Sequence, residues 1–129
     1  MEPGFRVIRS GELEWETRPR DSGSGDRHVA ALSEAAGLTL TRANLWRYEP
    51  GARGRRHKDL VQEETFVVVS GTLTMYLGDP PERHETDGLV HVEAGTPLQI
   101  VNEGDEDLVL YIHGAPPERG HAEFFDSAV

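Results

Sequence analysis

The chain of 129 residues has the size of a single domain with one buried core, and its 23 acidic against 13 basic residues give a formal net charge of −10. That acidity argues against a nucleic-acid partner, which requires a basic patch, because the sequence offers only one short basic run, at residues 53–58. Cysteine is absent, and this excludes disulfides, thiol catalysis and thiolate metal ligands.

No segment of the sequence is apolar enough for a membrane or for export. The apolar runs stay well short of the roughly 20 residues that a membrane span needs. Residues 1–14 are already charged and lack the apolar stretch of a signal peptide. We therefore expect a soluble, cytoplasmic protein without a membrane partner.

The first third of the chain mixes a strand, a loop and an ambiguous segment. Phe5–Arg9 is predicted as the first strand, and Ser22–Asp26 reads as a flexible loop because it alternates serine and glycine. Between Arg27 and Gly37 a short helix competes with a strand, since four alanines favour the helix. Gly37 ends any such helix after one or two turns.

From Leu38 onward the sequence is typical of short β-strands. Side chains alternate between two faces from Leu38 to Trp46, and the alternation places Arg42, Asn44 and Trp46 on one face. Pro50-Gly51 ends this strand with a turn.

The next strands are short and closely spaced. Thr65–Val69 is β-branched and aromatic, and Ser70-Gly71 predicts a tight turn that joins it to Thr72–Leu77 in a hairpin. Gly78–Pro81 breaks the second strand. Further strands are predicted at Leu89–Val92, Pro97–Val101 and Leu108–His113. After Pro116-Pro117 we expect a covering strand or loop, because Phe124 and Phe125 need a surface to pack against.

Many short strands with turn signals about every 8–12 residues indicate a sandwich or a barrel. The sequence shows no internal repeat, no alternation of helices with strands and no linker that would separate domains. These patterns predict an all-β protein with one domain over residues 1–129.

Two spaced motifs make the fold more specific. Gly51, His57, Glu64 and Gly71 resemble the first motif of the cupin superfamily, in which a glycine, a His-x-His pair, a glutamate and a second glycine follow at similar intervals. Residues 93–102 resemble the second motif through Gly95 and Asn102. The resemblance covers about residues 38–117 and implies a cupin-type antiparallel jelly-roll barrel with little helix, its site inside the barrel.

The resemblance also implies a candidate metal site. Metal-binding cupins use three histidines and one glutamate, and here His57 and Glu64 match the first histidine and the glutamate. Asp59 stands at the second histidine position and could bind a hard cation through oxygen, whereas Leu98 replaces the third histidine and has no ligand atom. The candidate set His57, Asp59 and Glu64 would suit a weakly held Mn²⁺, Mg²⁺ or Zn²⁺.

A metal-free alternative uses the same side chains. His57 would then be a hydrogen-bonded histidine of the barrel. Glu64, which strand parity places on the inner face, would be a buried acid paired with His57 or an arginine. Such a pairing can shift the pKa of the carboxyl into a range fit for proton transfer. His57 and Glu64 are therefore the candidate catalytic pair.

The pocket around this pair is predicted from strand parity. The lining residues we expect are Trp46, Phe66, Val68, Leu98 and Ile100. Trp46 and Tyr48 are either core residues or an aromatic wall at the cavity mouth. A buried Arg42 would indicate an anionic substrate, although charged residues are also common at half-exposed strand positions.

Three other polar residues near the motifs are weaker candidates for the site. Gln99 points away from the pocket by parity. His91 and His113 lie on predicted strands and could replace the missing ligand only if their side chains faced inward.

Three functions fit these expectations. The first is a small-molecule-binding cupin with an interior pocket that needs no metal. The second is a metal-dependent or acid–base enzyme of the dioxygenase, isomerase or cyclase type, acting on a small organic substrate. The third is a structural protein whose barrel is filled by side chains. Bound metal would favour the second and a filled cavity the third. We also expect a homodimer, since pairing through sheet edges covers unpaired backbone groups.

Overall fold

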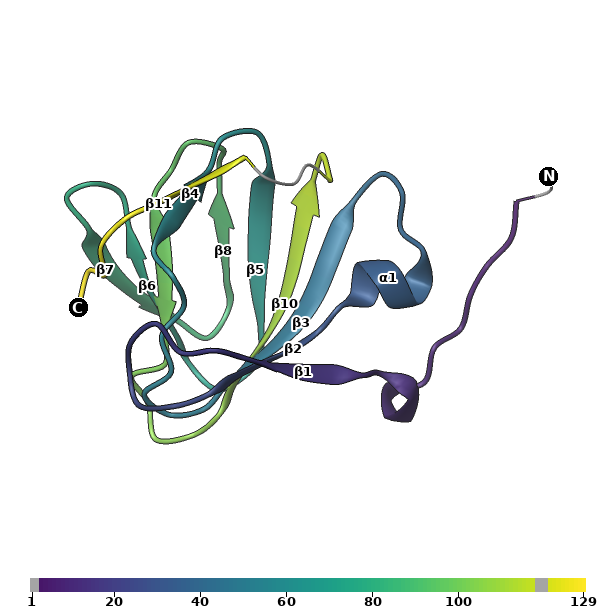
Figure 1. Ribbon diagram of the computed structural model, residues 1–129, viewed down its shortest axis with the longest axis horizontal. Helices are drawn as coiled ribbons and strands as arrows, with labels where there is room; N and C mark the ends of the chain where they lie inside the picture. The colour runs from purple at the N-terminus through teal and green to yellow at the C-terminus, as the bar shows by residue number, and fades with distance from the viewer. Residues whose placement is uncertain (1–2, 118–120) are drawn as a thin grey trace.

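The computed structural model describes residues 3–117 and 121–129, and in them the strands form two antiparallel sheets that face each other (Figure 1). The first sheet has the order β1 (Trp15–Arg18), β2 (Arg27–Ala30), β3 (Arg42–Tyr48), β10 (Leu108–Ala115), β5 (Glu63–Ser70) and β8 (Leu89–Val92). The second has the order β11 (Ala122–Phe124), β4 (His57–Asp59), β9 (Leu98–Val101), β6 (Leu73–Leu77) and β7 (Glu82–Thr86). The predicted all-β jelly-roll is confirmed.

Helix contributes little to the described part of the chain. It consists of the 3-10 turn η1 (Ser10–Glu12) and the five-residue helix α1 (Leu32–Ala36). The ambiguous segment from Arg27 to Gly37 therefore contains both alternatives, with strand β2 followed by α1. Gly37 adopts the left-handed conformation, with φ of 67°, and so ends the helix where the sequence predicts. No helix in the described residues is long and apolar enough to cross a membrane.

The core lies between the two sheets, where each sheet contributes alternate side chains. Strand β10 shows the alternation clearly, because Leu108, Leu110 and Ile112 are buried while the residues between them are half-buried. Phe66 of the first sheet and Met75 of the second belong to the same cluster. Burial of each such side chain stabilises the fold by roughly 1.5–3 kcal/mol.

The predicted hairpin through Gly71 is wrong. Strands β5 and β6 belong to different sheets, so Ser70-Gly71 turns the chain from one sheet to the other. Gly71 has φ of 85°, and a Cβ there would lie 2.6 Å from the carbonyl oxygen of Asp107, so this corner requires glycine. The hairpin that does form joins β6 to β7 across residues 78–81.

Two predictions for strands in the N-terminal part of the chain are also wrong. Phe5–Arg9 is not a strand, and Phe5 is 92% exposed. The first strand is Trp15–Arg18, which pairs with β2. The strand predicted from Leu38 begins at Arg42, because the residues after Gly37 are exposed and make no ladder.

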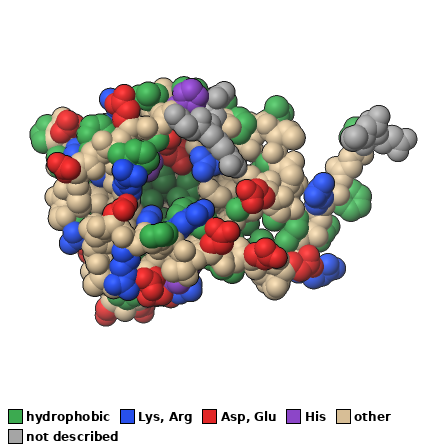
Figure 2. All heavy atoms as spheres, viewed as in Figure 1, with side chains coloured by type: hydrophobic (Ala, Val, Ile, Leu, Met, Phe, Trp, Pro, Cys, Tyr) green, Lys and Arg blue, Asp and Glu red, His purple; other side chains and the backbone are tan. Residues whose placement is uncertain are grey.

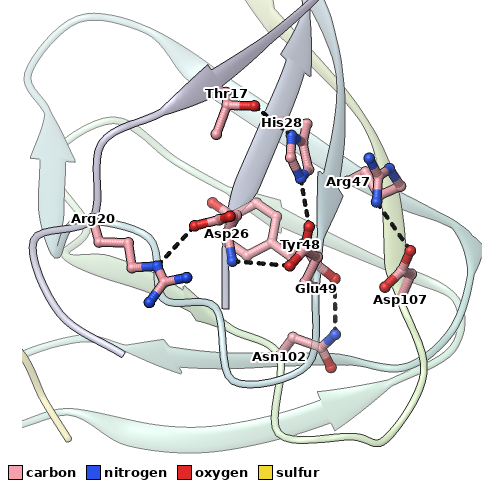
Figure 3. A network of polar contacts seen from close by, with 9 residues as sticks. All are labelled: Thr17, Arg20, Asp26, His28, Arg47, Tyr48, Glu49, Asn102 and Asp107. Atoms are coloured by element: carbon pink, nitrogen blue, oxygen red, sulfur yellow. Dashed lines mark hydrogen bonds and ion pairs between the residues drawn. The ribbon is translucent and has the colours of Figure 1, made fainter. Parts of the chain in front are cut away.

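Polar side chains fasten the end of β3 to its neighbours (Figure 3). His28 of β2 lies 2.7 Å from Glu49 through Nε2 and 2.8 Å from the Thr17 hydroxyl of β1 through Nδ1. Asn102, the asparagine of the second motif, donates hydrogen bonds from Nδ2 to the carbonyl oxygens of Tyr48 and Glu106. These bonds fix the loops at the end of the barrel that closes next to the Pro50-Gly51 turn.

Candidate functional site

A cavity of about 280 Å³ opens between the two sheets. Its lining comes from strands of both sheets and from the segment before β4: Arg27, Arg42, Asn44, Trp46, Tyr48, Gly54, Arg55, His57, Asp59, Glu64, Phe66, Leu98, Ile100, Ile112, Ala122 and Phe124. Figure 2 shows this face hollowed, with hydrophobic side chains in the depth of the hollow and basic side chains beside it.

One part of the cavity wall is apolar. Four of the five residues predicted for the pocket, Trp46, Phe66, Leu98 and Ile100, line it. The fifth, Val68, packs against the hydrophobic core and is not part of the lining. Trp46 and Tyr48 combine both predicted roles, because each packs in or against the core and also lines the cavity.

The three candidate ligand residues meet in this cavity. His57 and Asp59 are two residues apart on β4 and therefore project to the same face, while Glu64 approaches from β5 of the other sheet. One ligand atom of each lies within 4.8 Å of the other two. The His57 Nε2 atom is 3.7 Å from Asp59 Oδ2, the distance of an ion pair and longer than a hydrogen bond.

A backbone hydrogen bond fixes the orientation of the His57 ring. Its Nδ1 atom lies 2.8 Å from the carbonyl oxygen of Arg55. A carbonyl oxygen can only accept, so Nδ1 carries the proton and donates it. The Nε2 atom is therefore directed toward Asp59 and is available to a cation or a substrate proton.

The two carboxyl groups have pKa values that are driven apart. Burial raises the pKa of Glu64 to about 9, and its hydrogen bond to Asp59 and the charge of Asp59 act in the same direction. For Asp59, burial acts upward, but the close contact with His57, the hydrogen bond from Glu64 and the charges of His57 and Arg42 outweigh it and bring the pKa to about 2. At neutral pH, Glu64 is therefore a protonated acid that donates to an ionised Asp59.

His57 takes part in the same arrangement. Burial lowers its pKa, but contact with Asp59 and the bond to the Arg55 carbonyl more than compensate, and the net pKa lies above the usual value for histidine. The site therefore combines a proton donor, an ionised carboxylate and an imidazole that gains charge readily, all facing one cavity.

The donor set also fits a divalent cation. One imidazole nitrogen and two carboxylate oxygens, from His57, Asp59 and Glu64, are ligand types that zinc accepts. Binding would require Glu64 to lose its proton, which the cation itself favours. Leu98 pairs with His57 across β4 and β9, so at that position the wall offers a hydrocarbon side chain where a fourth ligand could stand.

The remaining polar candidates do not line the cavity. His91 is exposed on β8, where it lies 2.8 Å from the Thr65 hydroxyl, and His113 stacks against Tyr111. Gln99 is buried and donates to the carbonyl oxygen of Gly54 and to the Ser127 hydroxyl. Its function is to hold the C-terminal tail against the barrel.

Part of the lining is not foreseeable from the motifs. Arg27 lies on β2 and Arg55 in the segment before β4, and neither belongs to a cupin motif position. Ala122 and Phe124 arrive with β11, which pairs with β4. For β11 the sequence does offer a signal, because Phe124 and Phe125 need a surface to pack against and so predict that the tail covers part of the barrel.

A jelly-roll of two antiparallel sheets with a polar trio in an interior cavity defines the class of barrel proteins to which cupins belong. The family model described as "Cupin domain" matches residues 44–114, more than half of the chain, and the chain belongs to this family. No curated protein sequence matches it.

Solved structures resemble the whole barrel. A sugar phosphate isomerase from a cupin superfamily of Silicibacter pomeroyi superposes with a TM-score of 0.73 at 24% identity, covering 95% of this chain and 83% of that chain. A predicted oxalate decarboxylase from Thermotoga maritima gives 0.71 at 21% identity, covering 84% and 97%. The polyketide cyclase RemF from Streptomyces resistomycificus gives 0.76 at 16% identity, covering 96% and 88%. Identities this low support the shared fold alone.

Proposed function

We propose that the protein binds a small organic molecule in the cavity between its sheets. The observation that carries this proposal is the cavity itself, because about 280 Å³ stays open instead of being filled by side chains. Ligand sites for drug-sized molecules commonly enclose about 300–1,000 Å³, so this one suits a smaller compound. An open cavity also favours binding over the purely structural alternative.

The lining supports the same proposal. Ligand sites combine a mostly apolar wall with a few polar groups that orient the molecule. Here Trp46, Phe66 and Ile100 provide apolar wall, and His57 and Glu64 provide polar groups. The similar solved structures include proteins named for sugar phosphates, oxalate and polyketides, all of them organic molecules handled on this fold.

Tryptophan fluorescence offers a direct test. The chain has two tryptophans, Trp46 in the cavity wall and Trp15 on β1, where it is exposed. In a Trp15→Phe variant, Trp46 alone reports on the cavity. We expect at least one compound in a panel of sugars, sugar phosphates, dicarboxylates and hydroxylated aromatics to change this fluorescence saturably.

Cavity filling supplies the control for that experiment. Ala122→Phe adds a ring to the cavity wall from β11, the edge strand of the second sheet, and should abolish the signal. Ala94→Phe adds the same ring at an exposed turn and should leave the signal unchanged. If no compound acts at millimolar concentration, or if both variants behave alike, the proposed binding site is wrong.

A second candidate function is acid–base or metal-dependent catalysis at His57, Asp59 and Glu64. It is favoured by the separated pKa values of two adjacent carboxyl groups, an arrangement that assigns acid and base roles to chemically identical side chains. A divalent cation, when bound by the three side chains, would supply Lewis acidity. The residues themselves would orient the substrate and hold its proton on Glu64 or on His57 Nε2.

Elemental analysis tests the metal-dependent form of this second candidate. Untagged protein, purified without added metal, should contain near-stoichiometric transition metal if the catalytic site is a metal site. In that case Asp59→Asn and Glu64→Gln should each lose the metal. Full metal content in both variants would place the ion elsewhere.

A further inference from the structure

Three arginines from separate segments converge on the cavity. Among the described residues, the arginines of its lining are Arg27 of β2, Arg42 of β3 and Arg55 of the segment before β4. Arginine stays charged at every physiological pH. With Asp59 and Glu64 both counted as ionised and His57 as neutral, the lining still carries a formal charge of +1 (three positive, two negative) in a chain of −10.

The guanidinium groups are placed to receive a ligand. The side chain of Arg42 makes no hydrogen bond or ion pair with any described residue, although it lines the cavity and its charge acts on Asp59 and Glu64. A positive group in a partly enclosed site without a fixed partner is a natural binding group for an anion.

Aromatic rings support the other two arginines. The Arg27 guanidinium carbon lies 5.6 Å from the centre of the Trp46 ring, and that of Arg55 lies 3.7 Å from the centre of the Phe124 ring. Stacking orients the planar group and leaves its N–H edge free for oxygens. Arg27 donates to the Pro19 carbonyl oxygen at 3.1 Å, and Arg55 reaches Asp21 only at 4.0 Å. Each of these arginines retains further N–H donors.

We propose that the cavity is selective for an organic anion, whose carboxylate or phosphate group is bound by Arg27, Arg42 and Arg55 while its carbon skeleton packs against Phe66, Leu98 and Ile100. This inference rests on the proposed binding function and adds the chemical class of the ligand. The ligand must therefore have an anionic head group and an apolar body small enough for the cavity.

Three probes with one aromatic skeleton test the charge requirement. Benzyl alcohol is neutral, benzoate carries a carboxylate and phenyl phosphate carries a phosphate. In the Trp15→Phe background, and by calorimetry with wild type, at least one anion should bind about ten- to hundred-fold more tightly than the alcohol. The tighter of the two anions identifies the head group. The affinity of that anion should fall as salt is added.

Arginine variants test the residues. Arg42→Gln and Arg55→Gln should each weaken anion binding about tenfold or more, and should weaken the binding of benzyl alcohol by a much smaller factor. Arg47→Gln is the matched control, because Arg47 points to the opposite face of β3, where it pairs with Asp107. Arg42→Lys retains the positive charge but not the planar guanidinium that can bind an anion through two N–H groups, so it should give an intermediate loss of anion affinity. Circular dichroism confirms that each variant is folded.

The outcomes distinguish this inference from the function on which it rests. If the alcohol binds as tightly as both anions, or if Arg47→Gln weakens binding as much as Arg42→Gln, the anion site is refuted while small-molecule binding stands. If neither anion binds at millimolar concentration, the inference is refuted. Failure of the broader fluorescence panel as well would refute the binding function itself.

Discussion

Glu64 has a pKa far above the ordinary carboxyl value, at about 9. Its carboxyl group is buried at the start of β5 and shares a hydrogen bond with Asp59, so one of the two acids retains a proton while the other is ionised. Arg42 and His57 supply positive charge beside the pair, which lowers the cost of the remaining carboxylate. This balance of charge does not require a metal, and a cation would have to displace the Glu64 proton in order to bind.

The pH dependence of stability should reveal this proton. The folded protein retains it up to the raised pKa of about 9, whereas the unfolded chain releases it near the ordinary carboxyl value, so folding is progressively disfavoured as the pH rises between the two. In EDTA, Glu64→Gln should match wild type near pH 5 and exceed it at pH 8 by about 1 kcal/mol or more, since glutamine donates the same hydrogen bond without a charge.

Urea unfolding at several pH values measures this difference. Glu63→Gln is the control, because Glu63 is exposed on the outer face of the same strand and should show no such trend. Parallel pH curves for wild type and Glu64→Gln would show that the Glu64 carboxyl is ionised in the folded protein.

Restoring a histidine at position 98 tests the metal site. Leu98 pairs directly with His57 across β4 and β9, so Leu98→His would add an imidazole beside the trio. Imidazole suits Zn²⁺ and Ni²⁺ better than water does, and affinity should rise about tenfold or more. Calorimetric titration of wild type and Leu98→His measures the gain, with His57→Ala as the negative control. Equal affinity in all three proteins would remove the trio as the metal site.

At the scale of the elements, one buried side chain makes several contacts with the tail that follows β11. Gln99 accepts a hydrogen bond from the Ala128 backbone at 2.8 Å and donates to the Ser127 hydroxyl at 2.9 Å, while Gly54 accepts a third bond from it. One buried amide therefore joins the tail, the segment before β4 and strand β9.

Gln99→Leu should detach the tail while the barrel stays folded. The change leaves the Gly54 carbonyl and the Ala128 amide without these partners, at a cost of about 1–3 kcal/mol. Hydrogen exchange should accelerate in residues 121–129 and stay slow in β5 and β10. Ser127→Ala removes one of the three bonds and should give a smaller effect. Unchanged exchange in the tail would mean that its other contacts, those of Phe124 and Phe125 and the bonds from Arg53 and Arg56, hold it without Gln99.

The sequence predicted some of the strands well and others not. Alternation predicted the strands at 89–92 and 108–113 well, because each presents one face to a core. It could not assign Thr72–Leu77 to a sheet, since the turn chemistry of Ser70-Gly71 serves a hairpin and a corner between sheets equally. Strand β7 lacks an apolar face and stands at a sheet edge, so no periodicity marks it.

The sequence likewise predicted some residues of the site and not others. The motif spacing and strand parity predicted His57, Asp59 and Glu64, which lie close in sequence on two consecutive strands. Arg27 enters the cavity only through the packing of a distant segment, and Arg55, two residues before His57, is not a motif position. No local pattern distinguishes either from a surface arginine.

At the scale of the whole molecule, the N-terminal arm is the most exposed apolar segment. Residues 3–9 extend away from the barrel, with Phe5 92% and Val7 66% exposed, next to the edge strand β1 (Figure 1). Phe124 and Phe125, by contrast, contact Arg55 and Arg56 of their own chain. If two copies associate, the arm and the β1 edge are the surfaces that gain most from being covered.

We expect wild type to be a homodimer at micromolar concentration and the double variant Phe5→Asp/Val7→Asp to be monomeric. Both positions are exposed, so the substitutions should leave the fold intact. Light scattering gives the mass, and Leu40→Asp, another exposed apolar position, serves as the control. A monomeric wild type, or a dimer in the double variant, contradicts the expectation.

Strand β11 also has a consequence for protein engineering. It supplies Ala122 and Phe124 to the cavity wall but pairs with β4 alone, so the rest of the barrel does not depend on its side chains. A combinatorial library confined to residues 122–125 would therefore vary the shape of the cavity without altering either sheet's core. The residues that stabilise the fold are thus distinct from the wall residues that would be varied. This makes the chain a suitable scaffold for designed receptors of small molecules.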